Sequence, residues 1–205
     1  MEILGLDFDN TLVEYDEVFC RLARNNGLVE QTFKGNKVEV RKHLIEKGMN
    51  KEYTKLQAEV YGRGIRQAKA APNMLSALKK IKKRGIKLII ISHKTERPYA
   101  GGKFDLRGEA IEWLKKNEFF EESGLGFSLN QIYFEDTKEK KIERINMSGC
   151  TYFIDDMQSI LESIDQKINK IWYTHETQEC RTINTKKTKD WNEIARMIEK
   201  GNRWK

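Results

Sequence analysis

The chain has 205 residues, enough for one hydrophobic core or for a core with a modest insertion. Hydrophobic residues make up 39% and charged residues 34%, which excludes broad disorder, and the longest apolar run, Leu88–Ile91, is far too short to span a bilayer. The formal net charge of +7 is typical of solvated helix faces and also suits an anionic partner, but no nucleic-acid-binding motif accompanies it. Because no basic and apolar leader opens the sequence, we expect a cytoplasmic protein that does not enter the membrane.

The first part of the chain predicts one strand followed by a helical block. Residues 2–8 form an apolar run that predicts a short buried strand. Apolar residues then recur at helical spacing, which predicts helices over 14–27, 37–47 and 51–68. No strand signal interrupts residues 14–70, so we interpret this block as a helical insertion after the first strand.

From residue 72 onward, helices alternate with unbroken apolar strands. Pro72 can open a helix that Gly85 closes. Strands without a polar face are typical of parallel sheets that are covered on both sides. The pattern therefore predicts a three-layer α/β/α fold, a Rossmann-like parallel sheet, built from residues 1–13 and 71–205, with residues 14–70 inserted. The further strands are expected at 86–96, 131–134, 150–157 and 168–174, and the further helices at 106–119, 137–146, 159–165 and 189–200.

Three of these strands end in polar side chains: Asp7 and Asp9, then Ser92, then Asp155 and Asp156. Functional residues gather at the carboxyl ends of the strands in doubly wound sheets, so we expect a site there. Carboxylates that converge in a partly buried site repel one another, and a hard cation such as Mg²⁺ relieves that repulsion. A magnesium site with one carboxylate free to attack suits phosphoryl transfer through an aspartyl-phosphate.

These motifs resemble those of the haloacid dehalogenase-like (HAD) superfamily of phosphohydrolases. The first motif of that family, hhhDxDxT, matches Leu4–Thr11, the second matches Leu88–Ser92, and the fourth matches Tyr152–Asp156. The resemblance implies that Asp7 is the nucleophile and that Asp9 is the general acid and base. The motifs occur in the order of the family and span most of the chain.

The third motif of the family is a lysine, and "DTKEKKIERI" offers more than one. Lys138 stands at the expected start of a helix and is the preferred catalytic lysine. Lys141 is the alternative, because it lies beside Ile142 and could also point toward the site.

The resemblance also implies a set of metal ligands. Asp155 would bind Mg²⁺ directly together with Asp7, and the backbone carbonyl of Asp9 would be a further ligand. Asp156 would act nearby, through water or by holding the lysine. The phosphoryl group needs hydroxyl and ammonium donors. The residues expected to contact the substrate are Thr11, Ser92, His93, Lys94 and Lys141.

Asp9 also separates two kinds of chemistry in the family. Members that cleave carbon–halogen bonds lack the second aspartate, so its presence favours phosphate esters; Asn10 replaces the glycine often found at its position. Residues 14–70 match the place where many members carry a helical cap over the site. We therefore expect a magnesium-dependent phosphomonoester hydrolase, a monomer or homodimer, acting on a small soluble metabolite such as a sugar phosphate or a nucleotide. The alternatives are a phosphatase of nucleic-acid ends, a phosphomutase and a non-catalytic binding protein.

Overall fold

A computed structural model describes the chain except for residues 101, 178, 181 and 202–205. The chain forms two compact units, which we call the sheet unit and the helical unit. The sheet unit consists of Met1–Val13, Ala70–Lys94 and Asn117–Lys205, and the helical unit of Glu14–Lys69 and Thr95–Lys116. No helix of the described residues combines the length and the apolar character needed to cross a membrane.

The sheet unit is built on six parallel strands in the order β5-β4-β1-β6-β7-β8. The strand β1 lies in the middle of this sheet, between β4 and β6, so the three strands that end in polar groups are neighbours. The parallel α/β fold predicted from the apolar runs is confirmed. The bounds are β1 Ile3–Leu6, β4 Lys87–His93, β5 Ile132–Glu135, β6 Tyr152–Asp155, β7 Asn169–Tyr173 and β8 Thr185–Thr188.

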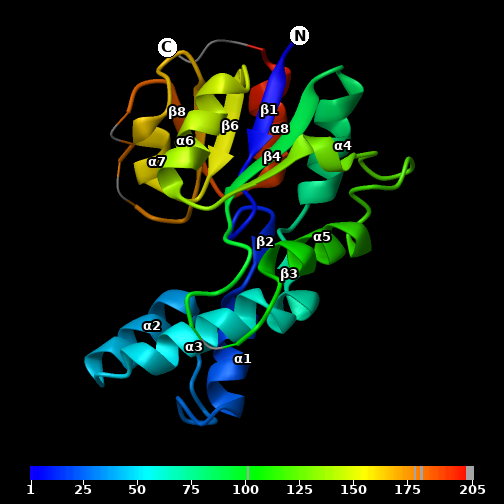
Figure 1. Ribbon diagram of the computed structural model, residues 1–205. Helices are drawn as coiled ribbons and strands as arrows, with labels where there is room; N and C mark the ends of the chain where they lie inside the picture. Colours follow the sequence, from blue (N-terminus) through cyan, green and yellow to red (C-terminus); the bar gives the residue numbers. More distant parts are fainter. Residues whose placement is uncertain (101, 178, 181, 202–205) are drawn as a thin grey trace. The chain divides into compact units, whose positions relative to one another are not determined.

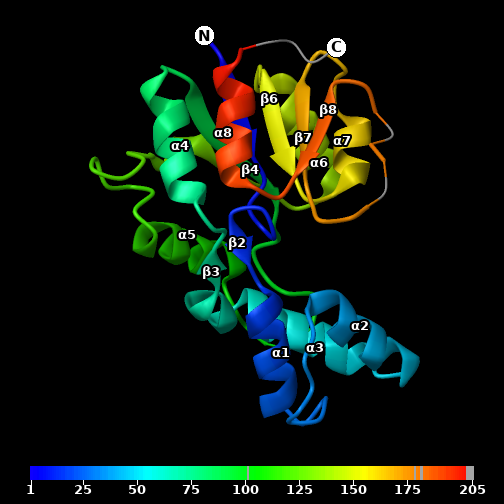
Figure 2. The ribbon, with the colours of Figure 1, turned by 180° about the vertical axis from the view of Figure 1, so that it is seen from behind.

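Helices cover both faces of this sheet and complete the three layers. The helices α4 (Met74–Lys83) and α8 (Trp191–Glu199) pack together on one face, and α6 (Lys138–Met147) and α7 (Gln158–Ser163) lie on the other (Figures 1 and 2). A short 3-10 helix, η2 (Leu129–Gln131), precedes β5. The alternation of strands and helices therefore gives the expected layered architecture.

The last strand, β8, was not predicted. Its sequence, TKKT, has no apolar residue, because β8 lies at the edge of the sheet. The ammonium group of Lys187 lies 5.9 Å from the ring centroid of Trp172, so its aliphatic stem can cover an apolar neighbour. Lysines on an edge strand also hinder pairing with other chains, which explains the polar sequence.

The helical unit contains the predicted insertion and one further helix. Its elements include α1 (Asp16–Asn25), α2 (Lys37–Glu46) and α3 (Asn50–Tyr61), and the 3-10 helix η1 (Arg63–Gln67) in place of the end of the long helix expected over 51–68. Gly62 follows α3 and separates it from η1. Two short strands, β2 (Val13–Glu14) and β3 (Lys69–Ala70), pair where the chain enters and leaves the insertion.

The further helix is α5 (Leu106–Lys116), which lies within the segment 71–205 expected to form the core and belongs to the helical unit. It clusters with the insertion because polar contacts tie it to η1 and the residues that follow. Arg66 donates two hydrogen bonds of 2.7 Å to Glu109, and the indole Nε1 of Trp113 donates one of 2.9 Å to the carbonyl of Ala68. These contacts join segments that are far apart in the sequence. No local sequence pattern could therefore predict that α5 belongs to the helical unit.

Gly5 in β1 marks a close approach between the two central strands. A Cβ atom on Gly5 would lie 2.5 Å from the ring of Phe153 and 2.9 Å from the Sγ atom of Cys150. The Phe153 side chain is fully buried in β6, so it has little room to move. This packing brings β1 and β6 together just before their polar ends.

We expect Gly5→Val to lower the free energy of unfolding by about 1–3 kcal/mol, because the added side chain overpacks the core. Thermal unfolding measures the loss. The smaller substitution Gly5→Ala should also clash with the ring of Phe153, and Phe153→Leu should relieve part of that clash. The variant that carries both Gly5→Ala and Phe153→Leu should therefore lose less stability than the sum of the losses in the two single variants. Equal midpoints for Gly5→Val and the wild type would contradict this packing.

Candidate active site

The site begins with the register of three parallel strands. Leu6 lies opposite Ile90 of β4 and Ile154 of β6. The next residue of β1 is Asp7, and its backbone N–H donates a 2.9 Å hydrogen bond to the carbonyl of Ile154. Asp7 therefore emerges beside Asp155, at the carboxyl edge of the sheet.

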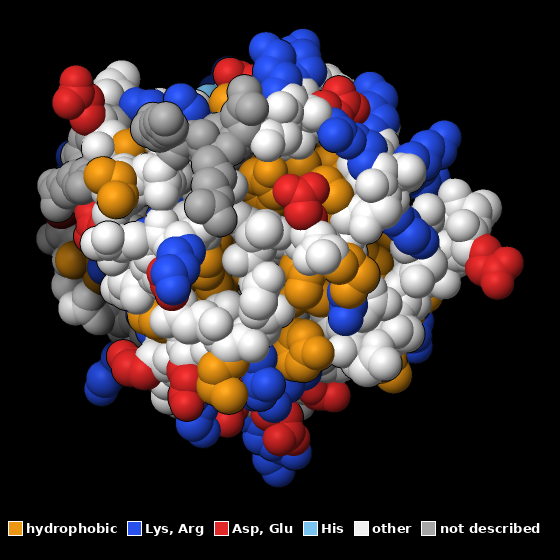
Figure 3. Space-filling model, turned by 90° about the horizontal axis from the view of Figure 1, so that it is seen from above, with side chains coloured by type: hydrophobic (Ala, Val, Ile, Leu, Met, Phe, Trp, Pro, Cys, Tyr) orange, Lys and Arg blue, Asp and Glu red, His pale blue; other side chains and the backbone are white. Residues whose placement is uncertain are grey.

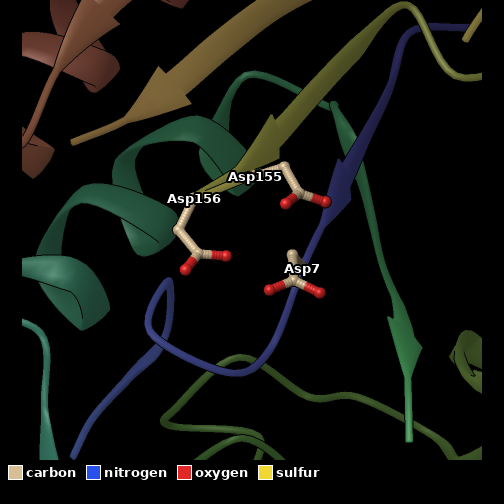
Figure 4. Close-up of side chains that lie close together, drawn as sticks. All are labelled: Asp7, Asp155 and Asp156. Atoms are coloured by element: carbon tan, nitrogen blue, oxygen red, sulfur yellow. The ribbon is translucent and has the colours of Figure 1, made fainter. Parts of the chain in front are cut away.

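Three carboxylates meet at this edge. Asp7, Asp155 and Asp156 each offer an oxygen, and these oxygens lie within 4.8 Å of one another (Figure 4). Asp7 and Asp155 are buried and Asp156 is partly buried. Oxygen ligands of this kind fit Mg²⁺, so the donor set can hold the expected cation. Asp156 belongs to the group, although the sequence had assigned it only a nearby role.

The lysine beside these carboxylates is Lys141. Its Nζ atom lies 2.6 Å from Oδ1 of Asp7 and 2.6 Å from Oδ2 of Asp155, and its side chain is only 3% exposed. Lys138, the preferred lysine of the sequence analysis, is exposed. The preference for Lys138 is therefore corrected in favour of Lys141.

The start of α6 explains this difference. Thr137 is the residue before the helix, and its hydroxyl accepts a 3.2 Å hydrogen bond from the backbone N–H of Lys140. With the helix start fixed there, Lys141 shares the buried helix face with Ile145, four residues later. Lys138 occupies the first helical position, with its side chain exposed.

Two hydroxyl groups flank the Asp7 carboxylate. Ser92 donates a 3.0 Å hydrogen bond to Oδ1, and Thr11 donates a longer one of 3.4 Å to Oδ2. Both residues are buried. The structure thus brings both predicted hydroxyl residues to the carboxylate that we expect to be the nucleophile.

Lys94 and His93 lie differently, although they are adjacent. The Nζ atom of Lys94 lies 2.9 Å from Oδ2 of Asp9, whereas Nε2 of His93 lies 3.0 Å from the backbone carbonyl of Asp136. Successive side chains of a strand point to opposite faces, so Lys94 shares the face of Ser92 and His93 does not. The structure therefore places Lys94, but not His93, beside an aspartate of the predicted site.

Asn10 is a site residue to which the sequence analysis gave no role. Its φ angle is +57°, in the left-handed region that glycine and asparagine adopt most readily. Its Nδ2 atom donates a 3.2 Å hydrogen bond to Oδ2 of Asp156. The motif usually has glycine at this position, and glycine and asparagine both tolerate a positive φ angle. This substitution was the sequence signal that could have indicated a turn after β1.

Burial and charge perturb the two central groups. Burial raises the pKa of Asp155 to about 8; the charges of Asp7 and Asp156 act in the same direction, and that of Lys141 opposes them. Burial alone would lower the pKa of Lys141, but Asp155 and Asp7 raise it above its ordinary value. Two buried carboxylates thus share one ammonium group, and a divalent cation would relieve their remaining repulsion.

We expect Lys141→Met to lower the free energy of unfolding by about 3–5 kcal/mol without divalent cations, because two buried carboxylates lose their cation. Mg²⁺ should restore part of this loss. Urea unfolding with and without Mg²⁺ measures both effects. Lys138→Met, at the exposed first turn, is the matched control and should change stability by less than about 0.5 kcal/mol.

The pKa of Asp155 predicts a pH dependence of stability. The folded state binds more protons than the unfolded state between the ordinary value of 3.8 and about 8. The free energy of unfolding of the metal-free protein should therefore fall as the pH rises through this range, by at most about 1.4 kcal/mol per pH unit. Asp155→Asn should make the slope shallower in chemical unfolding at several pH values. An unchanged slope in this variant would contradict the shift.

Comparisons with known proteins concern the fold. No protein-family model matches the sequence, and no curated protein matches it either. Among solved structures, the putative HAD hydrolase YfnB from Bacillus subtilis, described as bound to magnesium, is 10% identical with a TM-score of 0.60, over 96% of this chain and 98% of that chain. A HAD-superfamily hydrolase from Ehrlichia chaffeensis is 13% identical with a TM-score of 0.58, over 98% of both chains.

A third solved structure, the L-2-haloacid dehalogenase RSc1362, is 11% identical with a TM-score of 0.56, over 97% of this chain and 99% of that chain. The similarity to all three extends over nearly the whole length of each. The chain therefore has the fold of the haloacid dehalogenase-like superfamily, as the resemblance of its motifs implied.

Proposed function

We propose that this protein is a HAD-like hydrolase that cleaves phosphomonoesters with the help of Mg²⁺. The observation that carries this proposal is the set of contacts around Asp7. Its carboxylate contacts Lys141 and Ser92 and lies within a group of three acids. A nucleophile, an ammonium group, a hydroxyl group and potential metal ligands are the parts that phosphoryl transfer needs.

The cation would be held by Asp7, Asp155 and Asp156. When bound, Mg²⁺ would neutralise charge on the phosphoryl oxygens and draw the anionic substrate toward the acidic edge. A structural relative, YfnB, is described as bound to magnesium, which supports the choice of ion.

The reaction proceeds in two displacements at phosphorus. Oδ2 of Asp7, which accepts the long hydrogen bond from Thr11, attacks the phosphorus atom; the bond to the leaving oxygen breaks, and that oxygen takes a proton from the carboxyl group of Asp9. Water then attacks the aspartyl-phosphate and gives a proton to Asp9, the bond between phosphorus and Asp7 breaks, and phosphate is released. Lys141 and Ser92 hold the Asp7 side chain and stabilise charge on the transferred group.

Asp9 supports phosphate chemistry over dehalogenation. A halide ion leaves without a proton, whereas the alkoxide of a sugar or nucleoside needs one. The fold is shared with a haloacid dehalogenase, so the fold alone favours neither reaction. The acid two residues after Asp7 is the feature that favours a phosphate ester.

We infer a small substrate rather than the end of a nucleic acid. No nucleic-acid-binding motif accompanies the net charge of +7, and on the face that Figure 3 shows, at the amino ends of the strands, Lys and Arg side chains lie beside acidic and apolar ones. A nucleic-acid partner needs a continuous basic surface. We also propose that the helical unit, residues 14–69 and 95–116, is the cap of this hydrolase.

The test is phosphate release from 4-nitrophenyl phosphate and from a panel of sugar phosphates and nucleotides. We expect activity that depends on Mg²⁺ and that falls by at least about 10³-fold in Asp7→Asn, because the amide cannot form the aspartyl-phosphate. Asp165→Asn, at an exposed aspartate in the loop between α7 and β7, is a matched control and should retain wild-type rates.

Acid-quenched enzyme should carry one phosphoryl group on the peptide that contains Asp7, and mass spectrometry detects it. Activity that survives Asp7→Asn would overturn the nucleophile. Transfer of the phosphoryl group to a second hydroxyl of the substrate, in place of water, would indicate a phosphomutase. A wild type that neither binds Mg²⁺ nor releases phosphate would indicate a non-catalytic binding protein.

A further inference from the structure

Two parallel pairs of contacts join the end of β1 to the end of β4. Ser92 contacts Asp7 at 3.0 Å, and two residues further along each segment Lys94 contacts Asp9 at 2.9 Å. The first pair holds the nucleophile of the proposed reaction. The second pair holds the residue that moves protons in it.

Lys94 is a buried lysine. Its side chain is 3% exposed, and its Nζ atom lies 5.3 Å from the ring centroid of Phe8. Its backbone N–H donates a 2.9 Å hydrogen bond to the carbonyl of Glu135, which fixes the residue beside β5. The backbone of Lys94 is thus fixed, and its buried ammonium group contacts Asp9 beside the ring of Phe8.

Asp9 is less enclosed than its partner. Its side chain is 22% exposed, and it lies in the turn between β1 and Asn10, whose φ angle is +57°. A partly exposed carboxyl group on a turn can adopt several rotamers. A charge-assisted hydrogen bond from a fixed ammonium group selects one of them.

We propose that Lys94 is a positioning residue that acts through Asp9, and not a ligand of the substrate as its sequence position suggested. This inference rests on the proposed function. Lys94 keeps the carboxyl group of Asp9 within reach of the oxygen that gains or loses a proton. Proton transfer is sensitive to this distance, because the two heavy atoms must approach within hydrogen-bonding range.

The two roles of Lys94 have different kinetic consequences. Loss of a substrate ligand weakens binding and raises KM. Loss of a positioning contact leaves binding to Asp7, Ser92 and Lys141 intact but slows the chemical steps, so kcat falls and KM changes little. Removal of Asp9 should also abolish the effect of Lys94.

The experiment compares Lys94→Met, Asp9→Asn and the double variant on 4-nitrophenyl phosphate and on an alkyl phosphate, with saturating Mg²⁺. We expect Lys94→Met to lower kcat by about 10- to 100-fold, a part of the 10²- to 10⁴-fold that general acid–base catalysis contributes. KM should change by less than about threefold, as ground-state binding is retained. In the Asp9→Asn background, Lys94→Met should have less than about a threefold further effect, because residues that act as a unit are not additive.

Lys170→Met is the matched control. Lys170 is also a buried lysine of the sheet, but its Nζ atom contacts the backbone carbonyl of Ile164, 3.1 Å away. It should leave both kinetic constants unchanged. If Lys94→Met does not fold, Lys94→Gln keeps a side-chain donor and should show the same pattern with a smaller loss of kcat.

Three outcomes would overturn the inference. A raised KM with an unchanged kcat would make Lys94 a substrate ligand, and independent losses in the double variant would make its role structural. In both cases an active wild type with an inactive Asp7→Asn would leave the proposed function standing. If no compound yields phosphate with the wild type, the proposed function fails and the inference with it.

Discussion

Like charges buried at one edge of a sheet are the constraint around which this site is arranged. Asp7 and Asp155 are almost fully buried, and a single ammonium group, that of Lys141, lies 2.6 Å from each. Buried ion pairs contribute little net stability, since desolvation offsets their attraction, but a buried carboxylate without its partner is costly. We therefore interpret this cluster as a binding site for ions, because its ion pairs add little to the free energy of unfolding.

The rest of the sheet unit holds this cluster in place. The close approach at Gly5 brings β1 against β6, and the strand register then sets Asp7 beside Asp155. The N-terminal cap at Thr137 fixes where α6 begins, and through it which lysine faces inward. Precise backbone elements thus determine the side-chain geometry, as catalytic positioning requires.

The sequence predicted much of this arrangement because its signals are local. Unbroken apolar runs indicated the central strands, and the polar residues that follow them indicated the site. The edge strand β8 was not predicted because its residues are polar. The grouping of α5 with the helical unit could not be predicted because the contacts of α5 with η1 are distant in sequence. Lys138 was preferred over Lys141 because both are near the helix start, and a one-turn difference decides which one faces the core.

The site contains four carboxylates and two lysines, and three of the carboxylates contact a lysine. Lys141 lies between Asp7 and Asp155, and Lys94 contacts Asp9, while Asp156 accepts a hydrogen bond from Asn10, which is neutral. When all four carboxylates are ionised, the two ammonium groups leave an excess of two negative charges. One Mg²⁺ ion would balance this excess. Burial is the main cause of the raised pKa of Asp155, and the negative charges of Asp7 and Asp156 add to it, so a proton there relieves part of the excess when no cation does. In the function that we propose, a bound divalent cation would replace that proton and leave a nearly neutral site, so the phosphate dianion of a substrate would meet little repulsion there.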